Sequence, residues 1–298
     1  MKKNTFVRAL PVSRTSRVPA AAAFILSIHV VPAARGDEVT LDAARDNTLI
    51  ETTDGSRSNG MGDGIFAGRV GPMGGGTFRR AVLAFDVSSI PAGSTVTNVS
   101  LTLRVVMTQP GTSSVSPHRV LADWGEGTSE SAGGAGAPST PGDATWLHTF
   151  YDDEFWSEDG GDFSDTASAS LDVGSTGSYT WPSTPAMIAD VQQWVDDPAG
   201  NFGWVLIGNE VDLHSVKKFA SREWDSASQR PRLVITFDPP AKECPEDIDD
   251  SGDVGFSDLL AVLNAWGPCP SCPEDIDGDE TVGFSDLISI LNSWGPCP

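Results

Sequence analysis

The stretch VTNVSLTLRVVM, residues 96–107, alternates apolar and polar side chains along most of its length. This period of two is typical of a β-strand with one buried face. The residues on the apolar face are Val99, Leu101, Leu103, Val105 and Met107. Further strands, separated by segments rich in Gly, Pro, Ser and Asp, are predicted in RRAVLAFDV (79–87), FGWVLIG (202–208) and RLVITF (232–237). We therefore predict a mainly β fold, a jelly-roll β-sandwich, over residues 37–240.

One helix and one long loop interrupt this β pattern. Thr184 is a typical N-cap, Pro185 occupies the first helical position, and AMIADVQQWV (186–195) continues with helical spacing. That spacing predicts three inward-facing side chains, Ile188, Val191 and Val195. Residues 125–144, which contain SAGGAGAPSTPG, predict a long surface loop.

The first 36 residues predict a signal peptide. Basic residues begin the chain, at Lys2, Lys3, Arg8, Arg14 and Arg17. The short apolar run PAAAAFILSIHVVPA (19–33) follows, and Ala34 and Gly36 provide the small residues for cleavage before Asp37. The alternative is a membrane anchor, but the run is interrupted by Pro and His and is shorter than the roughly 20 apolar residues of a span. We therefore expect a secreted, extracellular protein without a membrane span.

The charge of the chain is strongly acidic. Without the first 36 residues it has 13 basic residues against 41 acidic ones. Such a surface repels nucleic acid and anionic lipid, so neither is an expected partner. From Glu243 onward, 13 acidic residues are accompanied by no Lys or Arg, so the acidity is concentrated at the C-terminal end.

This C-terminal end contains a repeat. DIDDSGDVGFSDLL (247–260) recurs 28 residues later as DIDGDETVGFSDLI (275–288). Oxygen-bearing side chains at positions 1, 3, 5 and 12 of each copy, with a backbone carbonyl at position 7, are typical of a loop that wraps around one Ca²⁺ ion. The predicted ligands are Asp247, Asp249, Ser251, Asp253 and Asp258 in the first loop, and Asp275, Asp277, Asp279, Thr281 and Asp286 in the second. We predict two calcium sites; acidic turns without a metal are the alternative.

A short apolar helix is predicted after each loop. Helical spacing relates Phe256, Leu259, Leu260, Leu263 and Trp266 in the first copy, and Phe284, Leu287, Ile288, Leu291 and Trp294 in the second. Each helix is expected to end at WGPCP, and too few residues precede either loop for an entering helix. The repeats are therefore predicted to be two loop–helix half EF-hands. The hydrophobic residues at position 8, Val254 and Val282, are expected to pair the two loops through a short β contact.

All four cysteines lie in this segment, which fits an exported module with a thin core. Cys244, Cys269, Cys272 and Cys297 allow three pairings. We favour Cys244–Cys269 with Cys272–Cys297, because each repeat then closes on itself. A zinc or redox site is disfavoured, since a CxxC spacing occurs once.

Residues 243–298 resemble a type I dockerin, the calcium-dependent docking module of bacterial polysaccharide-degrading systems. The resemblance implies that a cohesin-like partner binds the helix and the residues at loop positions 10 and 11, which are Phe256, Ser257, Phe284 and Ser285. Identical residues in both copies would permit two binding orientations. Glu280 departs from the pattern at position 6, where the first loop has Gly252, although Gly278 lies two residues earlier. The alternative is that both phenylalanines fill a small core.

Residues 39–238 resemble the bacterial DNRLRE-type domain, a secreted jelly-roll sandwich related to carbohydrate-binding modules. The resemblance rests on DNTLIE (46–51), RRAVLAFDVSSIPAGSTVTNVSLTLRV (79–105), ADWGEG (122–127), ADVQQWVDDPAGNFGWVLIGNE (189–210) and KKFASREWDSASQRPRLVITF (217–237). It implies a non-catalytic polysaccharide-binding or adhesive role.

Two sets of residues are candidates for contacting a polysaccharide. Sugar rings stack on exposed indoles, and the tryptophans in or beside loops are Trp124, Trp146, Trp156, Trp181 and Trp224. A basic cluster could hold an anionic glycan: Lys217, Lys218, Arg222, Arg230 and Arg232. We select Lys217, Lys218, Arg222 and Trp224 as the candidate carbohydrate site. The alternatives are that the tryptophans pack in the core and that the basic residues pair with acids such as Glu223 and Asp225.

An enzyme is the alternative to this binding function. YDDEFWSEDGGDF (151–163) contains enough carboxylates for a glycoside hydrolase pair, and a lyase carrying the same tail is also conceivable. Acid-rich loops are commonly just solvated. His118, His148 and His214 show no metal-ligand spacing, and the sequence contains no GxSxG motif. We therefore name no catalytic residue.

Overall fold

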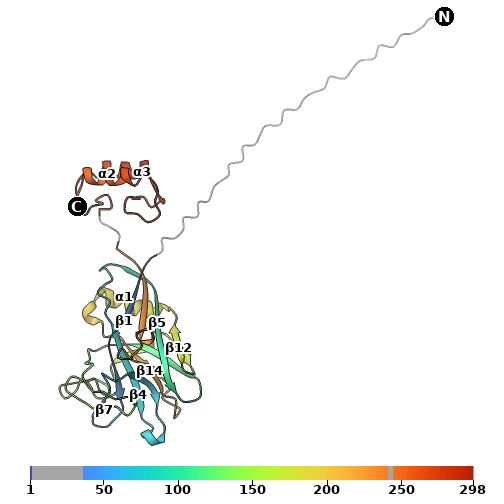
Figure 1. The fold of residues 1–298 in the computed structure, drawn as a ribbon, viewed down its shortest axis with the longest axis vertical. Coiled ribbons are helices and arrows are strands. Elements are labelled where there is room, and N and C mark those ends of the chain that lie inside the picture. Colours follow the sequence, from blue (N-terminus) through green and yellow to red (C-terminus); the bar gives the residue numbers. More distant parts are fainter. Residues whose placement is uncertain (2–35, 241–243, 298) are drawn as a thin grey trace. The chain divides into compact units, whose positions relative to one another are not determined.

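The computed structural model describes residues 36–240 and 244–297, together with Met1. The predicted signal peptide thus lies, apart from its two end residues, outside the described residues. Residues 36–240 form a closed β-sandwich, and residues 244–297 form a small unit with two helices (Figure 1). The prediction of a mainly β fold with a small helical C-terminal module is confirmed.

Long and medium strands build the sandwich. They are β1 (Asp37–Ile50), β3 (Gly64–Arg69), β4 (Phe78–Phe85), β5 (Thr95–Thr108), β6 (Ser113–Val120), β10 (Phe163–Ala167), β11 (Leu171–Val173), β12 (Gly177–Trp181), β13 (Trp204–Ile207), β14 (Lys217–Ala220) and β15 (Arg232–Asp238). Short pairs lie in the connections: β2 (Arg57–Ser58) with β7 (Ala137–Pro138), and β8 (His148–Phe150) with β9 (Glu154–Phe155). Three single-turn helices are η1 (Pro72–Gly74), η2 (Pro198–Gly200) and η3 (Ala227–Gln229).

Two strands pass from one sheet of the sandwich to the other. The first half of β1 pairs antiparallel with β15, and its second half pairs with β4 after a register shift between Ala43 and Arg45. Strand β3 pairs with β14 and then with β4, and the change falls at Gly68, whose φ is +115°. Bulges and glycines of this kind let a strand bend around the corner of a sandwich. The two sheets therefore close on each other.

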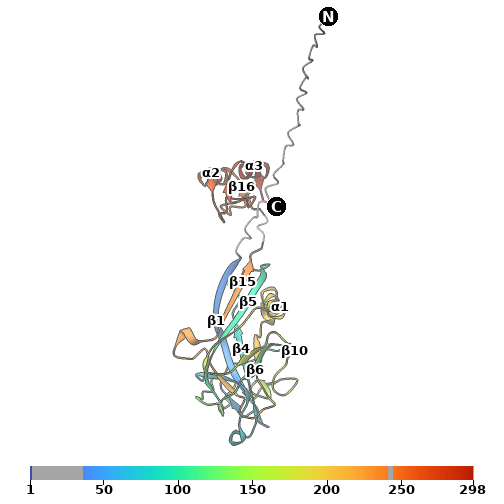
Figure 2. The same ribbon diagram turned by 90° about the vertical axis from the view of Figure 1, so that its right-hand side faces the viewer.

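The interior is filled by the apolar faces that the period of two predicts. Val99, Leu101, Leu103 and Val105 of β5 are fully buried, whereas Met107 at the end of the strand is 59% exposed. The single long helix of the sandwich, α1 (Pro185–Asp196), packs against β5 (Figure 2). The Oγ1 of Thr184 accepts a hydrogen bond from the Met187 amide at 3.0 Å, which confirms the predicted N-cap.

The buried face of α1 is wider than the sequence predicts. Val191 and Val195 are buried as expected, and Ile188 is half-buried. Met187 and Trp194 are also fully buried. Trp194 lies edge-on to Trp204 of β13, with 4.5 Å between the ring centroids, so the helix is anchored by an aromatic contact.

The segment 125–144 is not the simple surface loop that its composition predicts. Asp143 and Ala144 are fully buried, and β7 pairs with β2. The carboxylate of Asp143 accepts hydrogen bonds from the Thr140 amide at 2.6 Å and the Ser129 amide at 3.2 Å. These bonds satisfy backbone donors inside the segment and allow it to fold back onto the sandwich.

The C-terminal unit consists of α2 (Phe256–Asn264) and α3 (Phe284–Asn292) with four two-residue strands. These are β16 (Asp253–Val254), β17 (Gly267–Pro268), β18 (Thr281–Val282) and β19 (Gly295–Pro296). The two helices contact each other, and Val254, Val262, Val282 and Ile290 form the buried core of this unit. Within residues 244–297 no helix leads directly into either loop, which agrees with the predicted half EF-hands.

Each loop pairs with the end of the other repeat, so the predicted contact between the two loops is wrong. Val254 pairs with Gly295, and Val282 pairs with Gly267. The backbone donors of the two exit segments find acceptors at loop position 6. The Cys297 amide donates to the Gly252 carbonyl and the Cys269 amide to the Glu280 carbonyl, both at 2.9 Å. The repeats are therefore exchanged around an approximate twofold relationship.

The same exchange overturns the favoured disulfide pairing. The disulfides join Cys244 to Cys297 and Cys269 to Cys272. Each links the start of one repeat to the end of the other: Cys297 follows β19, which pairs with the first loop, and Cys269 and Cys272 are three residues apart. All four predicted cysteines are thus in disulfides, with the connectivity that the sequence spacing did not favour.

Replacing Gly68 with Ala tests the corner of the sandwich. A Cβ at Gly68 would lie 2.9 Å from the Cα of Val216, and L-residues rarely adopt its φ of +115°. We expect Gly68→Ala to lower the free energy of unfolding by about 1–3 kcal/mol, measured by thermal or denaturant unfolding. Gly111→Ala is the matched control, since Gly111 has a φ of +110° with nothing within 4 Å of the added Cβ. Equal losses for the two variants would show that the close approach to Val216 contributes nothing.

Candidate calcium sites and docking surface

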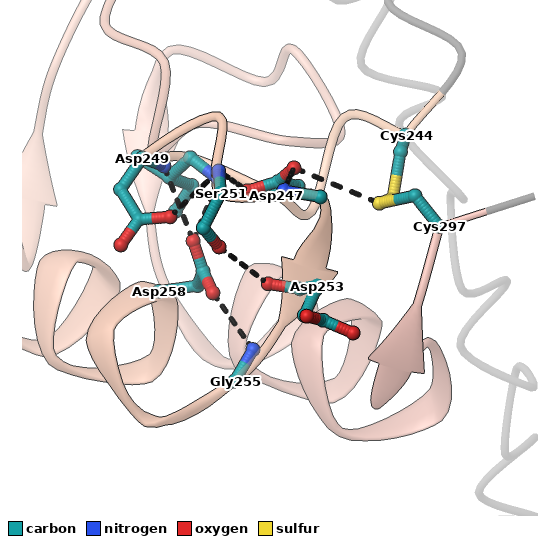
Figure 3. Close-up of a disulfide and its surroundings, with 10 residues drawn as sticks. Cys244, Asp247, Asp249, Ser251, Asp253, Gly255, Asp258 and Cys297 are labelled. Carbon is teal, nitrogen blue, oxygen red and sulfur yellow. Dashed lines mark hydrogen bonds between the residues drawn. A yellow bond between two sulfur atoms is a disulfide. The ribbon is translucent and has the colours of Figure 1, made fainter.

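Three carboxylates gather in the first loop. One oxygen from each of Asp247, Asp249 and Asp258 lies within 4.8 Å of the others (Figure 3). Asp247 accepts hydrogen bonds from the Ser251 amide at 3.0 Å and the Gly252 amide at 2.8 Å. The loop backbone thus holds the first ligand in place, and like charges at this spacing favour a bound cation.

Asp258 joins the loop to the helix that follows it. It is the third residue of α2, and its two carboxylate oxygens accept from the amides of Gly255 and Ile248, each at 2.7 Å. Burial would raise its pKa, but the amides of Gly255, Ile248 and Asp249 outweigh burial and lower it. The carboxylate is therefore ionised at neutral pH, as a calcium ligand must be.

The second loop repeats this arrangement. Oxygens of Asp275, Asp277 and Asp286 lie within 4.8 Å of one another. Asp286 accepts from the amides of Gly283 at 2.7 Å and Ile276 at 2.8 Å, and these amides lower its pKa against the effect of burial. Both donor sets consist of hard oxygen atoms, the ligands that Ca²⁺ prefers, so the residues fit this ion.

The predicted ligands at positions 5 and 7 differ between the loops. In the first loop the Ser251 hydroxyl donates to the carbonyl of Asp253 at 3.1 Å, so the two predicted donor oxygens are adjacent. In the second loop the Asp279 carboxylate accepts from the Thr281 amide at 2.9 Å. Asp279 therefore faces its own backbone rather than joining the three gathered carboxylates.

Positions 4 and 6 of each loop have left-handed backbone conformations. In the first loop they are Asp250 (φ +55°) and Gly252 (φ +90°), and in the second Gly278 (φ +73°) and Glu280 (φ +68°). Each loop thus has one glycine, which adopts this conformation without strain, and one residue that does not. Glu280 keeps the same turn as Gly252 at a cost of about 1–2 kcal/mol.

Each C-terminal helix presents a row of exposed apolar side chains, which we name the docking face. Phe256 is 65% exposed and Phe284 is 68% exposed, so the alternative that they fill the core is wrong. Ser257 and Ser285 beside them are exposed as well. The docking face comprises Phe256, Leu260, Leu263 and Trp266 with their counterparts Phe284, Ile288, Leu291 and Trp294. Exposed apolar rows of this kind mark interaction sites.

The Cys244–Cys297 disulfide lies beside the first acidic loop. The Sγ of Cys297 is 3.7 Å from the Oδ2 of Asp247. Figure 3 shows the disulfide at the start of the loop that carries Asp247, Asp249 and Ser251. The first ligand of the loop is therefore positioned next to a covalent link.

The basic residues selected as a carbohydrate site do not form an open cationic surface. Lys217 and Lys218 are buried. The ammonium of Lys217 donates to Thr108 and Gly111, and that of Lys218 pairs with Asp63 at 2.6 Å. Arg222 pairs with Glu126 at 2.8 Å and with Glu223 at 3.1 Å. The pair with Glu223 was the alternative to carbohydrate binding that the sequence offered. Trp224 is half-buried, with the Lys218 nitrogen 5.7 Å from its ring centre.

The other loop tryptophans pack inside the sandwich. Trp124, Trp146, Trp156 and Trp181 are all buried, so stacking of a sugar on them is excluded in this structure. In the acidic segment 151–163, Asp152, Asp153 and Glu154 are exposed. Asp162 accepts hydrogen bonds from the amides of Ser157 and Glu158 and so organises a turn.

A buried carboxylate cluster that the sequence did not reveal surrounds Arg222. The Arg222 amide donates to Asp46 at 2.7 Å, and its guanidinium contacts Glu126 and Glu223. Asp46 Oδ1 and Glu223 Oε2 are buried without a hydrogen-bond partner among the described residues. Asp46, Glu126 and Glu223 lie in three of the segments that carry the DNRLRE-type resemblance, which are DNTLIE, ADWGEG and KKFASREWD. These segments were the sequence signal that could have pointed to the cluster.

Burial dominates the electrostatics of this cluster. Burial, followed by the charge of Glu223, raises the pKa of Asp46 well above its usual value. Burial also raises the pKa of Glu126 and of Glu223, against the favourable charge of Arg222. The guanidinium of Arg222 thus contacts two of the three carboxyl groups, and each of the three binds a proton more readily in the native state than in the unfolded chain.

No helix within residues 36–240 and 244–297 is long and apolar enough to cross a membrane. No protein-family model matches the chain, and no curated protein matches it.

The carboxylate cluster makes a prediction for the pH dependence of stability. A carboxyl group with a raised native pKa binds more protons in the native state than in the unfolded state, where its pKa is about 4. Stability is therefore expected to fall as the pH rises from about 4 through the raised pKa values. Asp46→Asn should make the unfolding midpoint fall less steeply as the pH rises above about 4.

Asp153→Asn, which changes an exposed carboxylate by the same charge, is the control. It should leave the pH profile of the wild type unchanged. An Asp46→Asn profile parallel to that of the wild type would contradict the assignment.

Proposed function

We propose that the chain is an exported polysaccharide-binding or adhesive protein with a calcium-dependent, dockerin-like docking tail at residues 243–298. One observation, which occurs twice in the tail, carries this proposal: a cluster of carboxylates is followed by a helix with a row of exposed apolar side chains. The DNRLRE-type resemblance of residues 39–238 supports the polysaccharide-binding or adhesive role of the sandwich. The four disulfide-bonded cysteines fit an exported protein.

The calcium ligands and the docking residues are neighbours along the chain. Phe256 and Ser257 immediately precede Asp258, and Phe284 and Ser285 immediately precede Asp286. The last ligand of each loop lies in the first turn of its helix. A bound calcium ion would supply the positive charge that neutralises three nearby carboxylates. The loop would then hold the start of the helix, and with it the two docking residues, in a fixed position.

Because its core is small, the tail is expected to depend strongly on calcium for its stability. Val254, Val262, Val282 and Ile290 are its fully buried apolar side chains among residues 244–297. A unit of this size has too little buried area to be stable from its core and needs disulfides or metal ions. The exposed side chains of the docking face add little to this core, and an exposed apolar row of this kind supports the binding of a partner.

Calcium is expected to bind the full chain at two sites and to raise the unfolding midpoint of the tail. At a calcium concentration 100-fold above the dissociation constant, one site contributes about 2.7 kcal/mol. Asp247→Asn and Asp275→Asn should each remove one site from the stoichiometry measured by titration calorimetry. Asp253→Asn is the matched control, because Asp253 is predicted to offer its backbone carbonyl and not its side chain. The calcium proposal would be refuted if the unfolding curves in calcium and in excess chelator were the same and calorimetry detected no heat of calcium binding.

A type I cohesin domain is the probe for the docking face. Binding is expected in calcium and should be lost in chelator. Because the two copies are equivalent, Phe256→Ala or Phe284→Ala should weaken binding about twofold, whereas the double variant should abolish it. Phe155→Ala in the sandwich removes a phenylalanine that is 66% exposed and serves as the control. Loss of binding in either single variant would contradict equivalent faces, and absence of binding across a cohesin panel would refute the docking role.

A further inference from the structure

The outer face of the sandwich carries an arginine-lined groove, which we name the arginine groove. Leu101, Leu103 and Leu233 point into the core, so the alternating residues Thr102, Arg104 and Arg232 point outward. Thr102 of β5 pairs directly with Arg232 of β15. On the other side of β5, Arg104 pairs with Ser178 of β12.

These side chains enclose a hollow of about 250 Å³. Arg230, which follows η3, lines it together with Arg104 and Arg232. Hydroxyl and amide groups complete the lining, from Thr102, Ser178 and Gln229. Arg104 and Arg232 are diagonal neighbours on adjacent strands, so their Cα atoms are separated by about 7–8 Å.

The arginines of this groove form no ion pair among the described residues, although Glu223 and Asp42 lie near two of them. Within the described part of the chain, Arg45, Arg80, Arg119 and Arg222 form ion pairs, but Arg104, Arg230 and Arg232 do not. Arg230 donates to the Trp224 carbonyl at 2.8 Å and lies close enough to Glu223 to favour its ionised form. Asp42 is the cross-strand neighbour of Arg232 on β1. Arg104 and Arg232 therefore contribute the accessible positive charge.

Their chemistry suits a particular class of ligand. A guanidinium binds a carboxylate or sulfate through two parallel hydrogen bonds, and the surrounding hydroxyl and amide groups can bind sugar hydroxyls. Two guanidinium groups on neighbouring strands can bind two charges of one polymer at the same time, which an isolated anion does not offer. The rest of the chain is strongly acidic, so general electrostatics would repel such a polymer.

We infer that the arginine groove binds a carboxylate- or sulfate-bearing polysaccharide, with Arg104 and Arg232 as the principal contacts. This inference rests on the polysaccharide-binding role proposed above and assigns it to a site. The arginine groove takes the place of the earlier candidate carbohydrate site at Lys217, Lys218 and Arg222, because the charges of those residues are buried or paired.

The test is affinity electrophoresis and calorimetry of the full chain with three polymers in excess chelator. Chelator removes any contribution from the tail and from calcium bridges. Polygalacturonate presents carboxylates, dextran sulfate presents sulfates, and dextran is neutral. We expect binding to at least one polyanion and not to dextran, with the two polyanions distinguishing the charged group.

Arg104→Gln and Arg232→Gln are each expected to weaken this binding about tenfold, and the double variant by more, because charged hydrogen bonds are lost. Arg57→Gln is the matched control, since Arg57 is exposed and in no ion pair among the described residues. Unchanged unfolding midpoints would show that the variants remain folded.

The outcomes separate the two proposals. If the wild type binds no polymer in a broad panel, the polysaccharide-binding role fails and the assignment of the groove fails with it. If the double variant binds a polyanion as tightly as the wild type, the groove is wrong and the role stands. Binding to neutral dextran alone would also overturn the groove, because charge would not be the basis of recognition.

Discussion

The membership of β1 in both sheets is the constraint on which the sandwich depends. Its first half pairs with β15 and its second half with β4, so one continuous strand closes the two layers. Closure buries the inner faces of β5 and β15 and leaves their outer faces exposed. It also carries Asp46, just beyond the register shift, to Arg222 on the segment that follows β14. The buried carboxylate cluster and the arginine groove are thus two products of the same strand pairing.

The C-terminal unit is built on a different principle, the exchange of partners between two repeats. Each loop is completed by the exit segment of the other repeat, so neither repeat has its full set of backbone hydrogen bonds alone. This arrangement allows a very small core to support two ordered acidic loops. It also leaves the outer rows of α2 and α3 exposed, because the inner rows supply the core.

Local patterns in the sequence predicted local structure well. The period of two located β5, Thr184 and Pro185 located the start of α1, and the repeat located both loops and both helices. Properties that depend on distant segments were not predictable in this way. The Cys244–Cys297 disulfide joins residues 53 positions apart, and Lys217 and Lys218 are buried because β14 lies between β3 and β5. The groove likewise combines Arg104 with Arg230 and Arg232, which are more than 100 residues away in sequence.

The disulfide between Cys244 and Cys297 has a mechanical consequence. Cys244 is the first described residue after the segment that leads from the sandwich, and Cys297 lies just beyond α3. Tension applied to α3 would pass through this covalent bond to Cys244 without crossing the first repeat. Tension on α2 would reach the same point through its own loop. Both helices are therefore connected to the same residue, Cys244, α2 along the backbone and α3 through the disulfide.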